Sequence, residues 1–290
     1  MAYDASTYTG TWHIGDIKVT RVLEVENPSD LPMLPEATPE AIKAMPWLQP
    51  HFADADGKCA TSIHALVIEA DGKVIVVDTC LGNDKIRAFP HWNELHTNFM
   101  EKMEEAGYPP EKVDAVLCTH LHTDHVGWNT KLVDGEWVPT FPDARYLFGR
   151  EEWAHTEKQR VVPLYEEFIV DSIVPIIDAG LADFVEMDQQ ICEGVRLQPT
   201  PGHTPGHVSV VLESNGEKAI ITGDIMHHPC QVQHPRWECK FDWKREAAEE
   251  TREAMIKQFC DEKVLVFGTH FTTPSAGYVV DKGDHYEFEV

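Results

Sequence analysis

The sequence predicts an α/β protein with the architecture of a four-layer αββα sandwich. Along its 290 residues, apolar β-branched segments bounded by turn residues occur in two groups, and an amphipathic helical pattern accompanies each group. Two sheets that bury one face against each other leave their outer faces to be covered by helices. No internal linker interrupts the pattern, so residues 1–290 are expected to form a single domain.

Strands of the first half follow a proline-rich excursion at residues 27–57, which is expected to be ordered and to shape a pocket. Residues 59–70 and 72–79 are apolar runs, and Asp71-Gly72 between them is a strong hairpin signal. The short apolar run at residues 113–118 predicts a third, buried strand.

Helices are expected at three places. A helix is predicted between the second and third strands, because its apolar residues fall on one face and Gly107 marks its end. The residues of that face are Trp92, Leu95, Phe99, Met103 and Ala106. Residues 149–180 are predicted to be a helical insert that forms another wall of the pocket. A later amphipathic helix is expected at residues 243–259, with Asp242 as its N-cap.

Strands return in the second half at residues 195–200, 207–214, 218–224 and 263–270. Asn215-Gly216 joins two of them as a hairpin turn. The second half therefore repeats the order of the first and supplies the second sheet.

The net charge, the hydropathy and the cysteines of the chain limit the kinds of partner and compartment that can be expected. A formal net charge of −25 opposes binding to nucleic acid, which depends on basic side chains, and binding to an anionic membrane surface. No apolar run is long enough to span a membrane. The seven cysteines are odd in number and form no CxxC pair, and the N-terminus lacks the pattern of a signal peptide, so a cytoplasmic protein is expected. A small molecule is the expected partner, with a homodimer left open.

The segment THLHTDHVG, residues 119–127, concentrates four metal-binding side chains directly after a predicted strand. Further histidines and aspartates follow other strands, and rigid strands that end at one edge of a sandwich direct such loop residues toward a common point. Imidazole and carboxylate ligands without thiolate favour a catalytic site for zinc or another borderline divalent ion. The predicted ligands are His120, His122, Asp124, His125, His203, Asp224 and His270.

Seven ligands exceed the needs of one tetrahedral ion and match two ions bridged by Asp224. His120 and His122 are two residues apart in an extended loop, so both can face one ion, whereas Asp124 and His125 turn toward a second position. Zn²⁺ is the expected metal, with Mn²⁺, Co²⁺ and Fe²⁺ as alternatives.

The ordered motifs HLHTDHVG, PGHTPGH, TGD and GTH resemble the metallo-β-lactamase superfamily over residues 63–270. The resemblance implies the metallo-β-lactamase fold and a dinuclear hydrolase. Carried over by motif, it assigns one metal to His120, His122 and His203. It assigns the other metal to Asp124, His125 and His270, with Asp224 as the bridge and Asp78 in a mainly structural role behind them.

Within the superfamily, the segments DTCLGND, WNTKLVDGEW, GDIMHHPCQ and FDWKREAAEETR resemble acyl-homoserine-lactone lactonases and organophosphate hydrolases related to methyl parathion hydrolase. The lactonases place a tyrosine three residues after the bridging aspartate, and here that position is His227. Either His227 or His228 is expected to line the pocket and donate a hydrogen bond to the developing oxyanion. The alternative for this pair is a packed or surface role.

The expected reaction is metal-dependent hydrolysis, in which a hydroxide held between the two cations attacks a lactone or ester carbonyl and Asp124 orients that hydroxide. Two alternatives use the same fold: hydrolysis of a phosphotriester at the same site, and a persulfide-dioxygenase-like oxidation at a single iron. An apolar pocket is expected beside the metals, and its candidate lining residues are Trp47, Leu48, Phe52, Phe89, Trp92 and Trp128.

Overall fold

Two seven-stranded sheets form the centre of the protein in the computed structural model, which describes residues 10–29 and 31–290. In spatial order, the first sheet consists of β1 (Thr11–Ile14), β2 (Ile17–Ser29), β3 (Cys59–Ala70), β4 (Lys73–Val77), β5 (Ala115–Leu117), β8 (Arg145–Gly149) and β9 (Ala182–Val185). The second sheet consists of β10 (Gln190–Cys192), β11 (Val195–Pro199), β12 (Val208–Ser214), β13 (Glu217–Ile221), β14 (Leu265–Phe267), β15 (Ala276–Asp281) and β16 (Tyr286–Glu289). A separate hairpin joins β6 (Thr130–Val133) to β7 (Glu136–Pro139).

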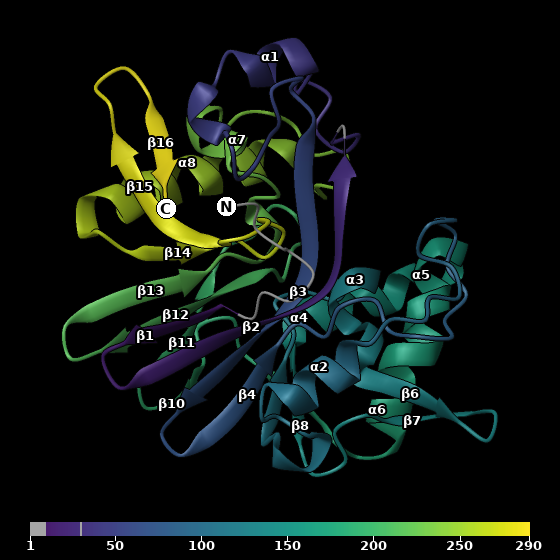
Figure 1. Ribbon diagram of the computed structural model, residues 1–290. Helices are drawn as coiled ribbons and strands as arrows, with labels where there is room; N and C mark the ends of the chain where they lie inside the picture. Colours follow the sequence, from purple (N-terminus) through teal and green to yellow (C-terminus); the bar gives the residue numbers. More distant parts are fainter. Residues whose placement is uncertain (1–9, 30) are drawn as a thin grey trace.

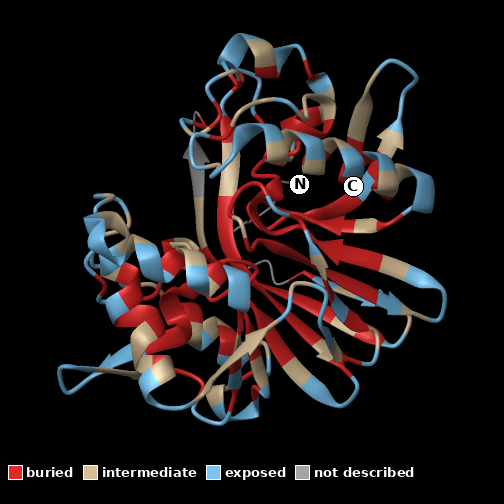
Figure 2. Cartoon of the chain, turned by 180° about the vertical axis from the view of Figure 1, so that it is seen from behind, coloured by how far each residue is buried: buried red, intermediate tan, exposed pale blue. Residues whose placement is uncertain are grey.

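The two sheets pack against each other through one apolar layer. Leu66, Ile75 and Leu117 from the first sheet are buried in the same cluster as Val210 and Ile221 from the second. Figure 2 shows that buried residues concentrate along the strands, whereas the outer sides of the helices and the connecting loops are exposed. Burial of apolar area between the sheets is therefore the main contribution to the central core.

Helices cover both outer faces of the sandwich (Figure 1). The first sheet is covered by α2 (Phe99–Glu105), α4 (Arg150–Thr156), α5 (Pro163–Phe168), the π-helical turn η6 (Ile169–Ile173) and α6 (Val174–Asp178). The second sheet is covered by α1 (Pro39–Lys43), α7 (Cys230–Gln233) and α8 (Arg245–Glu262). Short helical turns occur in the loops at η2 (Pro46–Leu48), η3 (Pro110–Lys112), α3 (Thr123–Val126), η4 (Gly127–Asn129), η5 (Glu157–Val161) and η7 (Gly223–Ile225). The predicted αββα architecture is confirmed.

Both predicted hairpins are present. Asp71 and Gly72 have φ of 52° and 70° and join β3 to β4, where Ala70 pairs with Lys73. Asn215 and Gly216 have φ of 52° and 81° and join β12 to β13. A two-residue turn that matches the twist of the strands needs positive φ at both residues. Asp-Gly and Asn-Gly adopt such angles readily, which is why these dipeptides predicted the hairpins.

The predicted helix from Trp92 to Ala106 is wrong in its first half, because α2 begins only at Phe99. The preceding loop is closed instead by a pair of hydrogen bonds: Thr97 N donates to Asn83 Oδ1 over 2.8 Å, and Asn83 Nδ2 donates to Thr97 O over 3.0 Å. Nine strands of the described residues were not predicted: β1, β2, β6, β7, β8, β9, β10, β15 and β16. The predicted excursion at residues 27–57 begins instead with the end of β2 at residues 27–29, and its residues 31–57 pack on the same core as α8.

Within the described residues, no helix is long and apolar enough to cross a membrane.

Candidate metal centre

Four loops bring the seven predicted ligands together at one edge of the sandwich. They follow β5, β11, β13 and β14, and the pairs β4–β5 and β13–β14 are parallel, so their carboxyl ends point to the same edge. The nitrogens and oxygens of these residues form three groups, and the atoms within each group lie within 4.8 Å of one another. The groups are His120, His122 and His203; Asp124, His125 and His270; and His120, His125 and Asp224.

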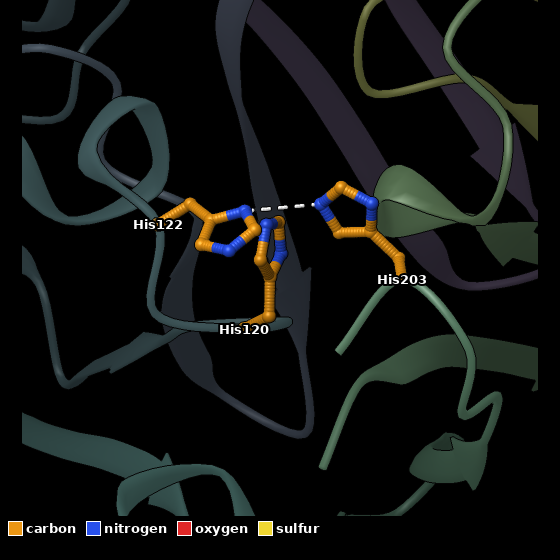
Figure 3. A group of neighbouring side chains, drawn as sticks. All are labelled: His120, His122 and His203. Atoms are coloured by element: carbon orange, nitrogen blue, oxygen red, sulfur yellow. Dashed lines mark hydrogen bonds between the residues drawn. The ribbon is translucent and has the colours of Figure 1, made fainter. Parts of the chain in front are cut away.

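Asp224 lies between the two histidine sets. Its Oδ2 is 3.8 Å from His120 Nε2 and 3.6 Å from His203 Nε2 on one side. On the other side it is 3.3 Å from His125 Nε2 and 3.2 Å from His270 Nε2. Figure 3 shows three of the imidazoles converging, with His122 Nδ1 and His203 Nε2 3.0 Å apart. The Asp224 carboxylate therefore lies within 4 Å of four imidazole nitrogens, two from each set.

The residues fit divalent metal ions on two further grounds. The Nε2 atoms of His120 and His125 are buried and make no hydrogen bond with the protein, so they are ring nitrogens directed at the centre without a protein partner. Burial lowers the pKa of His122 to about 4 and lowers the pKa of His120 and His203 well below the usual value, which keeps these rings neutral. The neutral imidazole is the form that binds metal.

Acidic groups carry the negative charge of the site. Burial by itself would raise the pKa of Asp224, but His125, His270 and His227 hold it well below its usual range. Burial likewise opposes protonation of His125, yet Asp224, Asp124 and Asp78 raise its pKa well above the usual value. The ionised carboxylates and the imidazoles thus interact as one buried electrostatic unit, which a cation would complete.

The Nδ1 atoms of His125 and His270 are held by the protein. Asp78 Oδ2 accepts a hydrogen bond from His125 Nδ1 over 3.0 Å, and its carboxylate also accepts from the backbone and side chain of Thr119. His270 Nδ1 donates to the carbonyl of Ser62 over 3.0 Å. Such contacts fix the ring orientation and the tautomer of a metal ligand. Asp78 therefore contacts a ligand directly, which is the less favoured of the two roles expected for it, behind a ligand or purely structural.

Asp242 has a different role from the one predicted. The N-cap of α8 is Lys244, and the Asp242 carboxylate instead accepts a hydrogen bond from His203 Nδ1 over 3.0 Å. A backbone contact explains this placement: Trp243 N donates to His203 O, which holds the segment before α8 beside the loop that carries His203. Aspartate before a helix is also the residue type preferred at an N-cap, so the sequence alone favoured the local interpretation.

Two more buried residues that sequence reasoning missed hold the metal loops. The Glu152 carboxylate accepts from Leu121 N over 3.1 Å and from Gly206 N over 3.2 Å, which ties the loops of His120 and His203 together. His207 Nε2 accepts from Asp224 N over 2.9 Å. The second histidine of PGHTPGH was a signal for His207, whereas nothing local distinguishes Glu152 from other glutamates of its helix.

The structure separates His227 from His228. His227 lines the cavity beside the ligands, and its Nε2 lies 3.4 Å from Asp224 Oδ2 and 3.6 Å from Cys239 Sγ. Both ring nitrogens of His228 are engaged elsewhere, because Nε2 donates to Phe52 O over 2.9 Å and Nδ1 accepts from Cys230 N. His228 therefore faces the core and has no free donor for a substrate.

A cavity of about 850 Å³ opens above the centre, with His122, Asp124 and Asp224 among its lining residues. Its apolar walls come from the loop before α2, helix α5, the segment before α8, and the excursion, which contributes Pro32 and Met33; Val25 of β2 and Ile63 of β3 complete them. Their lining side chains include Phe89, Trp92, Leu95, Leu164, Tyr165, Phe168, Phe241 and Trp243. Of the six predicted apolar residues, Phe89 and Trp92 line the cavity, whereas Trp47, Leu48, Phe52 and Trp128 pack elsewhere. A mostly apolar cavity of this size suits a small organic ligand.

Comparisons with known proteins show a family match and similar folds. The family described as the metallo-beta-lactamase superfamily matches residues 60–270. An N-acyl homoserine lactonase from Bacillus sp. is 30% identical over 119 residues, which are 41% of this chain and 40% of the relative, so the chain spans less than half of the lactonases that it matches. The fold is similar to that of hydrolase AbOPH in the β-lactamase superfamily, with a TM-score of 0.80, 24% identity, and coverage of 97% of this chain and 96% of that chain. It is also similar to AidC, described as a dizinc quorum-quenching lactonase, with a TM-score of 0.75, 20% identity, and coverage of 97% and 96%.

Proposed function

The chain belongs to the metallo-β-lactamase superfamily, and from this premise we propose that it is a dinuclear metal-dependent hydrolase that opens lactones or esters. One observation carries the proposal. Two sets of nitrogen and oxygen ligands lie on either side of Asp224 at the base of an apolar cavity. The names of the lactonase relatives favour a lactone as the substrate class.

In this proposal, His120, His122 and His203 would hold one divalent ion, Asp124, His125 and His270 would hold the other, and Asp224, between the two groups, would serve both. Zn²⁺ is the ion that this donor set suits best, with Mn²⁺, Co²⁺ and Fe²⁺ as alternatives. When bound, such ions lower the pKa of water to near neutrality and polarise a carbonyl oxygen.

The protein supplies proton transfer and orientation. Asp124 is only partly buried and lines the cavity, with Oδ2 3.5 Å from His270 Nε2, so its carboxylate is placed to accept the proton of an attacking water. His227 is the residue of the histidine pair that reaches the cavity, and we assign to it the hydrogen bond to the developing oxyanion. We withdraw that assignment for His228, because its ring nitrogens are already paired.

The cavity walls favour a substrate with an apolar group beside its reacting carbonyl. Phe89 packs edge-on against Trp92 and against Phe241, with ring centroids 5.0 and 6.3 Å apart, so aromatic side chains from two segments meet across the wall. An acyl or aryl group buried there would contribute about 0.8 kcal/mol per CH₂. A phosphotriester with aryl groups fits the same wall and is the second candidate substrate.

The test is a hydrolysis panel of lactones, aryl esters, phosphotriesters and β-lactams with zinc-, manganese- and cobalt-loaded protein, combined with elemental analysis. Two divalent ions per chain and turnover of lactones or esters are the expected result. Turnover confined to phosphotriesters would select the second candidate. A single iron per chain without hydrolysis would overturn the proposal in favour of the persulfide-dioxygenase-like alternative. The single-domain organisation, the homodimer and the cytoplasmic location are sequence predictions, and limited proteolysis, sedimentation and fractionation test them.

A further inference from the structure

A sulfur atom lies beside the nitrogen and oxygen ligands of the centre. Among the described residues, Cys239 is the cysteine whose Sγ groups with histidine nitrogens closely enough to share an ion, and its partners are His203 and His227. These atoms lie within 4.8 Å of one another, and the three residues are buried. Cys239 belongs to none of the ligand motifs, so the sequence alone did not indicate this contact.

The distance between His227 and Cys239 matches the edge of a small coordination polyhedron. A metal–nitrogen bond of about 2.0–2.1 Å and a metal–sulfur bond of about 2.3 Å give a tetrahedral edge of roughly 3.6 Å. His227 Nε2 is 3.6 Å from Cys239 Sγ, and a ring nitrogen of His203 lies within 4.8 Å of both atoms.

We propose that His203, His227 and Cys239 form an alternative cation position with an N₂S donor set, which takes a thiophilic divalent ion such as Co²⁺, Zn²⁺ or Cd²⁺. On binding, the Cys239 thiol releases its proton and the thiolate becomes a ligand. The ion reaches this position through the cavity, since His203 and His227 line it.

The position competes with one half of the main centre instead of adding a third ion. One His203 Nε2 coordinates one cation, and the same atom lies 3.0 Å from His122 Nδ1 in the group formed with His120. An ion on the His203 side therefore has two alternative positions, one with nitrogen ligands only and one that includes the sulfur of Cys239. In the second position His227 is a ligand, so it is available as the oxyanion donor of the proposed function only when the ion occupies the first. Soft thiolate ligands select thiophilic ions over Mn²⁺ and Mg²⁺, so the identity of the metal determines which position is filled.

Cobalt(II) spectroscopy tests the proposal without any substrate, so its outcome is independent of the proposed hydrolysis. Chelator-treated protein is titrated anaerobically with Co²⁺ while the visible d–d bands and the near-ultraviolet thiolate-to-cobalt charge-transfer band are recorded. The expected result is a charge-transfer band in the wild type that is lost in Cys239→Ser, with total cobalt per chain unchanged. Cys260→Ser is the matched control, because Cys260 lies on the far part of α8 and joins no metal group.

Two results would overturn the proposal. One is a wild type with d–d bands but no charge-transfer band, which would make the Cys239–His227 contact only an S–H···N hydrogen bond. The other is a band that survives in Cys239→Ser. The first does not depend on the folding of any variant. Absence of all cobalt bands would instead show that the main centre itself fails to bind, which separates the two proposals.

Discussion

Replacement of Asp242 by asparagine should weaken metal binding at the His203 side of the centre by about 10- to 100-fold. The Asp242 carboxylate accepts from His203 Nδ1 over 3.0 Å, and both side chains are only 1% exposed, so water does not screen the contact. A hydrogen bond to a charged group contributes about 1.5–3 kcal/mol. A tenfold change in affinity corresponds to about 1.4 kcal/mol, so the two magnitudes agree.

Zinc affinity would be measured by competition with a chromogenic chelator, at a temperature well below the unfolding midpoint of each variant. The unfolding control matters because Asp242 also lies 3.5 Å from the fully buried Arg252, which loses part of its ionic partner in the asparagine variant. Asp261→Asn removes the same charge from α8 at a side chain that is 60% exposed, and it should leave affinity unchanged. An Asp242→Asn protein that is folded and binds zinc within twofold of the wild type would refute the orienting role.

Three further outcomes are expected. Asp124→Asn should retain at least one metal and lose about 10²–10⁴-fold in turnover, because an amide cannot accept the proton of the attacking water; an active variant would remove Asp124 from the mechanism. His227→Ala should keep its metal and lose about 10²–10³ in turnover, whereas His228→Ala should alter stability more than rate; equal rates for both would leave the oxyanion to the cations alone. Burial lowers the pKa of Lys85 to about 7, so the unfolded chain binds more protons between about pH 7 and pH 10 and the free energy of unfolding should rise with pH there. Chemical unfolding at several pH values tests this, and Lys85→Met should flatten the slope.

The candidate ligands were predictable because each lies within a few residues of a strand end. The end of an apolar run in the sequence marks the end of the strand, and histidines in the loop directly after it lie at the edge of the sheet. His120 after β5 and His270 after β14 follow this rule, although 150 positions separate them in the chain. Hairpins were predictable for a similar reason, since Asp71-Gly72 and Asn215-Gly216 specify their turn locally.

Glu152 and Asp242 were not predictable in their roles behind the ligands, because their partners are far away in the sequence. Glu152 joins backbone groups 31 and 54 positions away, and Asp242 meets His203 39 positions away. The same limit explains the wrong start of α2, where the Asn83–Thr97 hydrogen bonds override a helical apolar pattern. Trp128 was expected in the pocket, but its Nε1 donates to the buried Glu24, so the ring packs behind the metal loop.

These contacts explain how the fold holds several buried histidines and carboxylates close together in fixed orientations. Two ligands are oriented by a residue of their own half of the chain: His125 by Asp78, and His203 by Asp242. His270 of the second half is oriented by the Ser62 carbonyl of the first. Each buried ring nitrogen left without a protein partner costs about 1–3 kcal/mol, which the fold must offset elsewhere. A cation that satisfies these nitrogens recovers that free energy, so metal affinity and fold stability are coupled through the same few side chains. The orienting residues determine the geometry in which this coupling occurs, and so Asp242 and Glu152, which coordinate nothing themselves, decide how tightly the centre can bind.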